Sequence, residues 1–398
     1  MNASATDASA TNSAANNSTD IAIVGGGPVG AALALALHGS GLSVTVLEAR
    51  EASVAAARDP RPIALSQGSR MLLERLDAWQ GLAPTPIINV HVSQRGRFGR
   101  AALSARDAGV PAFGYVFDYK EIFLKLATLA RAADSVYCDG AQVTAIHRDG
   151  DLSGIDYVLN GAQATLRARL TVVADGGDID GLAAAKSVDY QQCALTTRVR
   201  TTLPHGNTAY ERFTPEGPLA LLPFGDEMAV VWTLTPQRAQ TLMDAGDIPF
   251  LAALREAFGG RVGEFTAVSQ RACFALTLRT TREAAMPGVV SIGNAAQTLH
   301  PVAGQGFNLG LRDAWELAQV LRAVSVQAIA DPATLRRYRA SRRVDRYGTV
   351  GATHGLVRLF SNDIFPLTAL RGAGITLLGC LPPARDFLAR RMMFGAHG

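Results

Sequence analysis

Short apolar runs alternate with glycine turns and helix-like stretches along the first half of the chain. Residues 21–24 and 44–47 are nearly continuous apolar runs, as expected for buried parallel strands. The stretch 31–37 between them predicts a helix packed on the sheet, so the three segments form a βαβ unit. Further helices are predicted at 72–79 and 121–132, further strands at 136–147, 157–169 and 170–174, and irregular strands across 81–111.

The pattern changes in the second half. Residues 190–235 carry Thr, Val, Tyr, Phe and Trp in short runs broken by Pro and Gly, which predicts a mostly antiparallel sheet. A helical stretch at 236–258 follows, and 289–292 returns to a buried strand. Apolar residues recur with a period near 3.6 across 305–324, which predicts an amphipathic helix. The first domain is therefore discontinuous, with the β-rich region inserted into it.

We predict an α/β fold, α+β overall, with a Rossmann-like nucleotide-binding domain, an inserted antiparallel substrate sheet and a helical C-terminal tail. Residues 1–19 are almost all small and polar, which predicts a disordered tail. The nucleotide-binding domain is expected at 20–82, 112–182 and 270–345, the substrate domain at 83–111 and 183–269, and the helical C-terminal segment at 346–398.

Composition narrows the classes of function. Apolar residues make up 48% of the 398 residues and charged residues 18%, so the chain can bury a large core. The net charge of +4 is too small and too dispersed for a dedicated nucleic-acid binder. The four cysteines lie far apart without a CxxC spacing, so neither a metal site nor a disulfide framework is expected, and a reducing compartment is indicated.

Targeting signals also bear on location. No Lys or Arg precedes Arg50, so the features of a secretory signal and of a mitochondrial presequence are both missing. No apolar run approaches the roughly 18 residues that span a bilayer. We expect a cytoplasmic protein that does not cross a membrane, with peripheral association at the inner face of the cytoplasmic membrane as the alternative.

The first chemical motif is a glycine loop after the first strand. Gly25, Gly27 and Gly30 fit GxGxxG, in which the glycines allow a tight turn, a close approach of pyrophosphate and close helix–strand packing, respectively. Glu48 ends the next strand, where an acidic residue binds the ribose of a dinucleotide. Because a carboxylate there repels a 2′-phosphate, the motif favours FAD or NAD over NADP.

Two further segments carry candidate chemistry. An apolar strand ends in Asp175-Gly176, where an ordinary turn is favoured on local grounds and a ligand-binding carboxylate is the alternative. The segment 291–310 reads as a strand, a polar loop and a helix start with Gly304, Gly306 and Gly310. We expect these glycines to let the backbone approach a flat polar group, with the positive end of the helix aimed at it. His300 alone is more typical of a hydrogen-bonded loop residue than of a catalyst.

These motifs, in this order, resemble the aromatic-hydroxylase group of FAD-dependent monooxygenases, the p-hydroxybenzoate hydroxylase fold. The resemblance covers roughly residues 20–345. The segments 293–301 and 303–310, with Arg61-Pro62-Ile63-Ala64-Leu65-Ser66, look most like the 2-polyprenyl-6-methoxyphenol hydroxylase branch of ubiquinone biosynthesis. The resemblance implies that NAD(P)H reduces FAD and that O2 then forms a flavin C4a-hydroperoxide, which hydroxylates a polyprenylated phenol.

The resemblance also implies site residues. Pro301, Gly304, Gln305 and Gly306 would surround the flavin ring, and no catalytic base is identified. The implied cofactor-binding residues are Gly25, Gly27, Gly30, Glu48, Arg61, Lys120, Asp175, Asn294, Gly304, Gln305, Gly306 and Asn308. Two departures stand out: Asn294 replaces the usual Asp, keeping the acceptor oxygen but losing the charge, and the loop 177–181 lacks the usual Ser and Arg.

Two alternatives stay open beside this function: a hydroxylase of a small soluble aromatic, and a non-catalytic FAD-binding subunit of a quinone-biosynthesis complex. A flavin halogenase is disfavoured because the WxWxIP signature is missing. Residues 219–224 and 230–232 are candidates for the substrate pocket, although sheet core is the favoured interpretation.

Arginines dominate the C-terminal part of the chain. Six of them crowd into 336–346: Arg336, Arg337, Arg339, Arg342, Arg343 and Arg346. A solvated helix face is favoured there, and contact with anionic lipid or a protein partner is the alternative. Residues 356–394 mix apolar clusters with further arginines, a pattern typical of a membrane-surface or complex-docking helix.

Overall fold

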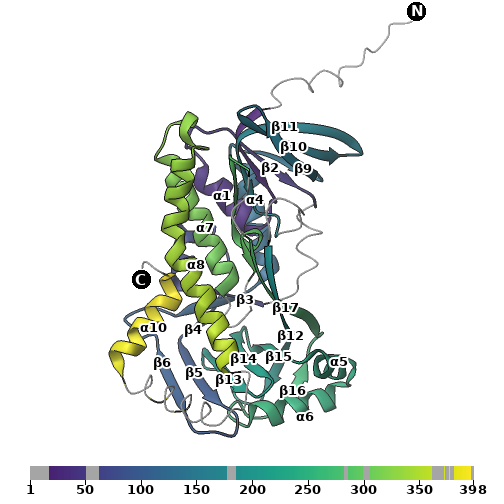
Figure 1. The fold of residues 1–398 in the computed structure, drawn as a ribbon. Coiled ribbons are helices and arrows are strands. Elements are labelled where there is room, and N and C mark those ends of the chain that lie inside the picture. Colours follow the sequence, from purple (N-terminus) through teal and green to yellow (C-terminus); the bar gives the residue numbers. More distant parts are fainter. Residues whose placement is uncertain are drawn as a thin grey trace, which may run out of the picture.

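The computed structural model describes residues 18–50, 62–176, 185–281, 286–298, 305–360, 372, 376 and 381–395. Two lobes are stacked along the long axis of the molecule, each built around its own sheet (Figure 1). The predicted α/β architecture, with an inserted antiparallel sheet and C-terminal helices, is confirmed. No described helix is both long and apolar enough to span a bilayer.

The first sheet combines a parallel layer with an antiparallel extension. Its parallel strands run in the order β8 (Val136–Asp139), β2 (Val44–Glu48), β1 (Ser18–Val24), β11 (Ala162–Val173) and β18 (Val289–Ser291). The antiparallel strands β10 (Leu152–Leu159) and β9 (Gln142–Asp149) continue it beyond the first half of β11. The parallel layer ends at one edge, where β1, β2 and β11 deliver the predicted glycine loop, Glu48 and Asp175.

A hairpin replaces one predicted strand. The prediction of a continuous strand at 157–169 is wrong, because β10 and β11 are separate strands joined by the two-residue turn Asn160-Gly161. Both turn residues have positive φ, 52° and 81°, which matches the type I′ turn that Asn-Gly favours. The predicted strand at 136–147 is likewise divided, into β8 and β9.

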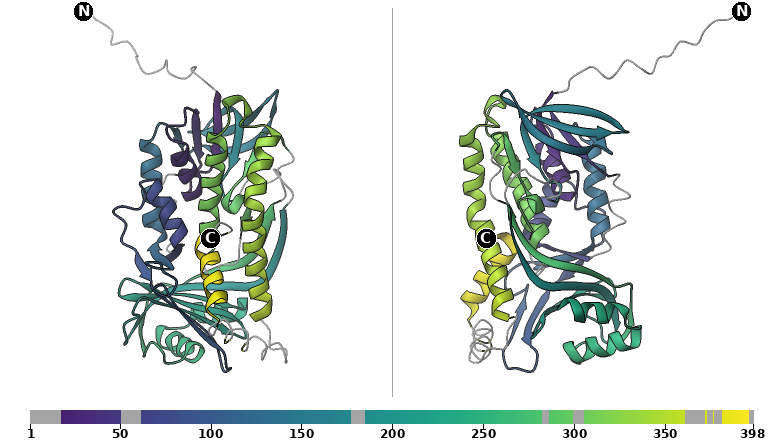
Figure 2. Two further views of the ribbon diagram at one scale, coloured as in Figure 1. Left: turned by 90° about the vertical axis from the view of Figure 1, so that its left-hand side faces the viewer. Right: turned by 45° about the vertical axis from the view of Figure 1, so that its right-hand side comes forward.

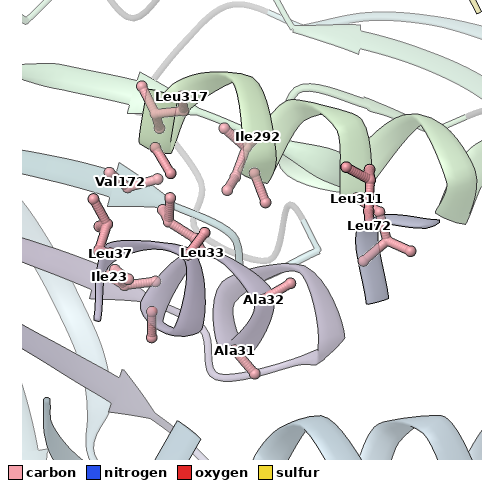
Figure 3. Close-up of a cluster of buried hydrophobic side chains, with 14 of the residues drawn as sticks. Ile23, Ala31, Ala32, Leu33, Leu37, Leu72, Val172, Ile292, Leu311 and Leu317 are labelled. Carbon is pink, nitrogen blue, oxygen red and sulfur yellow. The ribbon is translucent and has the colours of Figure 1, made fainter. Parts of the chain in front are cut away.

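Helices cover the first sheet and form the main core with it. The helices of this lobe are α1 (Pro28–Leu37), α3 (Gln67–Arg75), α4 (Tyr119–Ala132) and α7 (Gln305–Arg322). Figure 3 shows Leu33 and Leu37 of α1 between the sheet residues Ile23 and Val172 and the residues Ile292 and Leu317. All of these side chains are essentially inaccessible, so α1 lies inside the lobe, consistent with its apolar sequence.

The second sheet forms the other lobe. Its strand order is β19 (Gln297–Thr298), β17 (Ala272–Thr281), β12 (Ala185–Thr201), β15 (Glu227–Leu234), β14 (Gly217–Phe224), β13 (Thr208–Thr214), β5 (Asn89–Gln94) and β6 (Arg100–Ser104). β16 (Phe265–Val268) pairs with the end of β12. All neighbouring strands are antiparallel except β13 and β5. One face of this sheet is covered by α5 (Pro236–Asp244) and α6 (Asp247–Phe258).

A small third sheet and two long helices join the lobes. The small sheet has the order β3 (Pro62–Ser66), β7 (Gly114–Asp118) and β4 (Thr85–Ile87). Figure 2 shows α8 (Pro332–Phe360) running beside α7 and on toward the second sheet. α10 (Pro382–Phe394) packs against α3, where a side chain at Gly68 would lie 2.6 Å from the carbonyl oxygen of Met393.

The bounds of three elements cross the predicted domain limits. β1 begins at Ser18, so Ser18 and Thr19 belong to the sheet and not to the tail predicted at 1–19. β17 pairs with β12 over ten residues, which extends the substrate sheet to Thr281, beyond the predicted limit at 269. The predicted limit at 345 falls inside α8, a single helix. Residues 1–17 lie outside the described residues.

Candidate functional site

The glycine loop connects β1 with α1, and each glycine has a different neighbourhood. Gly25 has φ of +101°, and a Cβ atom there would lie 2.6 Å from the Asp175 backbone. A Cβ at Gly30 would overlap the Gly25 carbonyl oxygen, which agrees with the packing role expected for the third glycine. At Gly27, by contrast, no atom of the described part of the chain lies within 4 Å of the Cβ position. The loop is therefore closed on the protein side and open at Gly27.

Glu48 joins the same loop from the end of β2. Its Oε2 accepts a hydrogen bond from the Gly26 N–H at 2.6 Å, and its Oε1 accepts one from the Arg50 N–H at 2.9 Å. The side chain is only partly buried, so the carboxylate keeps acceptor capacity toward a ligand. The predicted ribose-binding acid thus lies beside the predicted phosphate-binding loop.

A tyrosine that carries no sequence motif supports this loop. The Tyr137 hydroxyl, from β8, donates to the Gly26 carbonyl oxygen at 2.7 Å, and burial raises the pKa of this phenol. Its ring lies 4.1 Å from the Arg131 guanidinium, which is paired with Asp139 at 2.9 Å. No spacing rule connects β8 with the glycine loop, so this support became visible only in the fold.

Asp175 follows the end of β11 directly beside Gly25. The Ala174 N–H donates to the Val24 carbonyl oxygen at 2.7 Å, which holds this strand end against the glycine loop. Gly176 has φ of +88°, as the turn interpretation expects. The two interpretations of Asp-Gly are therefore compatible, because the turn itself carries Asp175 to the loop.

A second approach to the site comes from the segment after β18. A short 3₁₀ turn, η1 (Gly293–Ala295), leaves the Asn294 side chain exposed. The Asp313 carboxylate accepts hydrogen bonds from the Gly293 N–H at 3.2 Å and from Gln297 Nε2 at 3.0 Å. Asp313 belongs to α7, so this helix fixes the turn that presents Asn294.

The start of α7 lies close to the first glycine loop. A Cβ at Gly310 would lie 2.8 Å from Cγ2 of Val29. This glycine therefore lets α7 pack on α1, whereas we expected it to face a ligand. Gly306 precedes it by four residues, about 6 Å along a helix axis. No atom of the described residues lies within 4 Å of the Gly306 Cβ position, so this part of the structure leaves the backbone of the first turn of α7 open.

Asn308 has a different role from the one expected of its side chain. Its Oδ1 accepts hydrogen bonds from the Ser66 N–H at 2.8 Å and the Ser69 hydroxyl at 2.6 Å, and its Nδ2 donates to the Ala64 carbonyl oxygen at 3.0 Å. The side chain is 1% exposed. It therefore joins α7 to β3 and α3.

A third helix start lies near that of α7. The rings of Tyr119, the first residue of α4, and Phe307 are 6.4 Å apart. Lys120 is exposed at this end of α4, and its N–H is capped by the Asp118 carboxylate at 3.0 Å. The predicted residues Lys120 and Gly306 are thereby brought to neighbouring helix ends. Arg61, His300, Pro301, Gly304 and the loop 177–181 lie outside the described residues.

A buried ion cluster anchors α7 to α8. Arg342 is fully buried between Asp313 Oδ1 at 2.7 Å and Asp345 Oδ2 at 2.9 Å, and Arg312 pairs with Asp345 at 2.8 Å. Arg346 donates a further hydrogen bond to Gln297. The expectation of a solvated arginine face is therefore wrong for Arg342, because two buried carboxylates neutralise it. Arg336, Arg337 and Arg343 of the same run are exposed.

The second sheet presents two different faces. Along β14, Leu219 and Leu221 are fully buried against α5 and α6, whereas Ala220, Leu222 and Phe224 are only partly buried. Cross-strand pairing adds Val231 to this second, partly buried set, while Val230 and Trp232 join the core. Sheet core is thus the correct interpretation for half of 219–224 and 230–232. The other half forms an apolar surface on the opposite face.

These features fit an extended dinucleotide. Three helix N-termini, those of α1, α4 and α7, contribute the positive ends of their helix dipoles. Open glycine backbone at Gly27 and Gly306 admits flat or anionic groups, and Glu48 supplies a hydroxyl acceptor. Gly27, Pro28 and Glu48 suit an adenosine diphosphate half, and the first turn of α7 suits an isoalloxazine.

Comparisons with known proteins agree with this geometry. The model of the family described as "FAD binding domain" matches residues 18–347. Ubiquinone hydroxylase UbiL of Rhodospirillum rubrum is 34% identical over 95% of this chain and 90% of its own length. The 3-demethoxyubiquinol 3-hydroxylase of Escherichia coli is 32% identical over 90% of this chain and 94% of its own.

The solved structures show the same fold at lower identity. p-Nitrophenol 4-monooxygenase PnpA from Pseudomonas putida superposes with a TM-score of 0.77 at 19% identity, covering 95% of this chain and 99% of its own. This likeness extends to both lobes because it covers nearly all of each chain. The chain therefore belongs to the FAD binding domain family, and FAD is its cofactor.

Proposed function

We propose that this FAD-dependent hydroxylase acts on the aromatic ring of a prenylated methoxyphenol in ubiquinone biosynthesis, with NAD(P)H and O2 as co-substrates. The observation that carries the proposal is full-length similarity to two proteins named as ubiquinone-ring hydroxylases. The apolar face of the second sheet supports it, because Leu222, Phe224 and Val231 offer a surface on which a prenylated ring can be excluded from water.

The residues of the site would divide the work in the following way. Bound FAD, once reduced by NAD(P)H, supplies the activation of O2. The glycine loop and Glu48 bind the adenosine half, and the N-terminus of α7 stabilises negative charge on the ring system. The apolar sheet face orients the phenol and keeps water from the reacting atoms.

A reduction experiment tests the proposal. The purified protein is mixed anaerobically with NADH or NADPH, with and without 2-prenyl-6-methoxyphenol, while the flavin absorbance is followed. We expect the flavin to bleach faster with the phenol, and a hydroxylated product to form once O2 is admitted. Equal stimulation by a simple phenol without a prenyl chain would instead favour a hydroxylase of small soluble aromatics. A yellow protein that is never reduced would favour a non-catalytic subunit.

We also infer contact with a membrane surface through a C-terminal patch formed by Arg343, Val344, Tyr347, Phe387 and Arg390. Val344, Tyr347 and Phe387 are 63%, 74% and 72% exposed, which is unusual for side chains of this size. The Arg391 side chain donates to the Val344 carbonyl oxygen at 3.1 Å, which holds α10 beside this part of α8. Exposed arginines next to apolar side chains are typical of helices that lie on anionic lipid.

Sedimentation with vesicles tests this patch. The double variant Tyr347→Glu/Phe387→Glu is compared with wild type on phosphatidylglycerol-containing and on purely zwitterionic vesicles. Ile248→Glu is the matched control, because Ile248 is 83% exposed on α6, away from α8 and α10. We expect only the double variant to lose binding to anionic vesicles. Equal sedimentation of all three proteins would reject the patch, and binding to neither vesicle type would reject lipid as its partner.

A further inference from the structure

Glu211 occupies the middle of β13, with Val92 of β5 on one side and Ala220 of β14 on the other. Its sequence neighbours point to the helix-covered face of the sheet. The Tyr210 ring lies 5.6 Å from the Phe258 ring, and Arg212 Nε donates to the Ala257 carbonyl oxygen at 3.1 Å. Because side chains alternate along a strand, Glu211 lies on the opposite face.

That opposite face is directed toward the FAD-binding lobe. Ala209, two residues before Glu211, packs in one cluster with Ile87 and Val116 of the small sheet and with Leu222 and Phe224. The small sheet is joined in turn to α7, since Asn308 binds the Ala64 carbonyl oxygen of β3. Glu211 therefore belongs to the same partly buried apolar surface that we assign to the substrate.

The surroundings of Glu211 are unusual for a carboxyl group. The same row of the sheet continues through Val92, Ala220 and Val231, so its neighbours across the strands are apolar. Among the described residues, no hydrogen bond or ion pair involves its carboxylate. The other charged side chains on this face in the described part of the sheet are Arg198, Arg200 and Glu227. Both arginines pair with Glu227, and Arg198 also stacks on Phe224 at 5.5 Å.

Glu211 is expected to change its protonation state near neutral pH in this environment. Burial raises the pKa of Glu211 to about 7, and no charge is among its causes. Glu211 as a residue is only partly buried, so we expect a small molecule on this face to reach it. A desolvated carboxyl without a partner costs folding free energy, and such groups concentrate where a ligand or a reaction uses them.

We propose that Glu211 is the general base for the phenol substrate: its carboxylate contacts the phenolic hydroxyl and accepts its proton. This inference rests on the proposed function. In the step, the phenolic O–H bond breaks, the proton moves to a Glu211 oxygen, and its electron pair stays on the ring oxygen. The phenolate donates that density into the ring, which becomes more nucleophilic at the carbon to be hydroxylated. When the product regains its aromaticity, the ring carbon loses its hydrogen as a proton to water, and Glu211 returns the proton it holds to the ring oxygen.

Isosteric substitution tests the assignment. Glu211→Gln keeps the shape but cannot accept the proton, and Glu256→Gln is the matched control. Glu256 lies on α6, on the other face of the same sheet, and pairs with Arg95 at 2.7 Å. Hydroxylated product and H2O2 are measured between pH 5.5 and 9, with FAD content determined from the visible spectrum. A separate ultraviolet titration records whether the bound methoxyphenol ionises.

For wild type and Glu256→Gln, we expect product formation to rise with pH through an apparent pKa near 7. For Glu211→Gln, we expect full FAD content, product formation lowered by about 10²- to 10⁴-fold, and loss of this rise. The bound phenol should ionise at lower pH in wild type than in Glu211→Gln, a difference that a purely structural residue would not produce.

Each failure has its own signature. If wild type hydroxylates the phenol and Glu211→Gln matches its rate and pH profile, the Glu211 assignment is overturned and the proposed function stands. If wild type does not hydroxylate any prenylated phenol, the proposed function fails and the assignment with it. Should Glu211→Gln not fold, Glu211→Asp decides: a retained pH profile with a lowered rate supports the assignment, and an unchanged rate overturns it.

Discussion

Removing Arg342 should destabilise the protein and loosen its flavin together. The side chain has no solvent exposure and lies between two buried carboxylates, Asp313 at 2.7 Å and Asp345 at 2.9 Å. Arg342→Met keeps much of the volume but leaves these carboxylates without their shared cation. Breaking a buried pair in this way costs about 3–5 kcal/mol. We expect the lower end, because Arg312 still pairs with Asp345.

The consequence for the site follows from what Asp313 holds. Its Oδ2 accepts from the Gly293 N–H and from Gln297 Nε2, so a displaced Asp313 frees the turn that presents Asn294. Arg342→Met should therefore release FAD more readily than wild type does. Part of this loss of FAD binding should persist under conditions where the variant remains folded, because the turn and the fold depend on the same carboxylate.

Urea denaturation of the flavin-loaded protein, followed by far-UV circular dichroism and flavin fluorescence, measures both effects. At an m-value of about 3 kcal/mol/M, the expected loss moves the midpoint by about 1 M. Arg337→Met is the control, since Arg337 is exposed on the same helix and its loss should stay within about 0.5 kcal/mol. Equal urea midpoints for Arg342→Met and Arg337→Met would show that the buried pairs of Arg342 add no stability. In a double-mutant cycle, Asp313→Asn should recover part of the loss of Arg342→Met.

Three other predictions address the site and its pH dependence. Gly306→Val should fold normally, because none of the described residues has an atom within 4 Å of its Cβ position, yet purify without yellow colour; a fully flavinated variant would contradict the placement of the ring. Tyr137→Phe should weaken FAD binding and lower the unfolding free energy by about 1 kcal/mol, as read from FAD titration and urea melts, since one partly buried hydrogen bond is lost; unchanged affinity would remove Tyr137 from the site. Burial alone would raise the pKa of Asp345, but Arg312 and Arg342 outweigh it and lower that pKa. The folded pKa is thus below the unfolded one, so this stabilisation is complete above about pH 4 and is lost as the pH falls through the folded pKa. The urea unfolding midpoint should therefore fall less at acid pH in Asp345→Asn than in wild type. An equal fall in both proteins would count against the cluster.

Local patterns were sufficient where one segment determines its own structure. The apolar run at 21–24, the glycines at 25, 27 and 30 and the acid at 48 each have a role that follows from chain geometry within one βαβ unit. The amphipathic helix at 305–324 was likewise readable, because its apolar stripe contacts a single core. The Asn160-Gly161 hairpin was also readable in principle, since this dipeptide is a strong hairpin signal.

Contacts between distant segments were not readable in the same way. Arg342 looks like its exposed neighbours in an arginine-rich run, and only the packing of α8 on α7 brings it between Asp313 and Asp345. Asn308 matched a cofactor motif, yet its side chain binds residues more than 230 positions away. Such roles depend on tertiary partners that no local spacing encodes.

The two faces of the second sheet illustrate the same limit. Alternation along β14 was present in the sequence, but both alternating sets are apolar, so their difference was invisible until α5 and α6 covered one of them. For the same reason, no pattern in the sequence identified Glu211 as a site residue. A single acid in a strand is usually exposed, and its apolar surroundings come from β5 and β14, which flank it only in the folded sheet.

We expect a single FAD to extend from the glycine loop of α1 to the first turn of α7. A crystal structure of the protein purified with FAD tests it most directly. We predict the adenosine ribose at Glu48, the pyrophosphate over Gly27, and the isoalloxazine beside Gln305 and Gly306. An isoalloxazine bound away from the start of α7, or adenosine bound away from Glu48, would contradict the account.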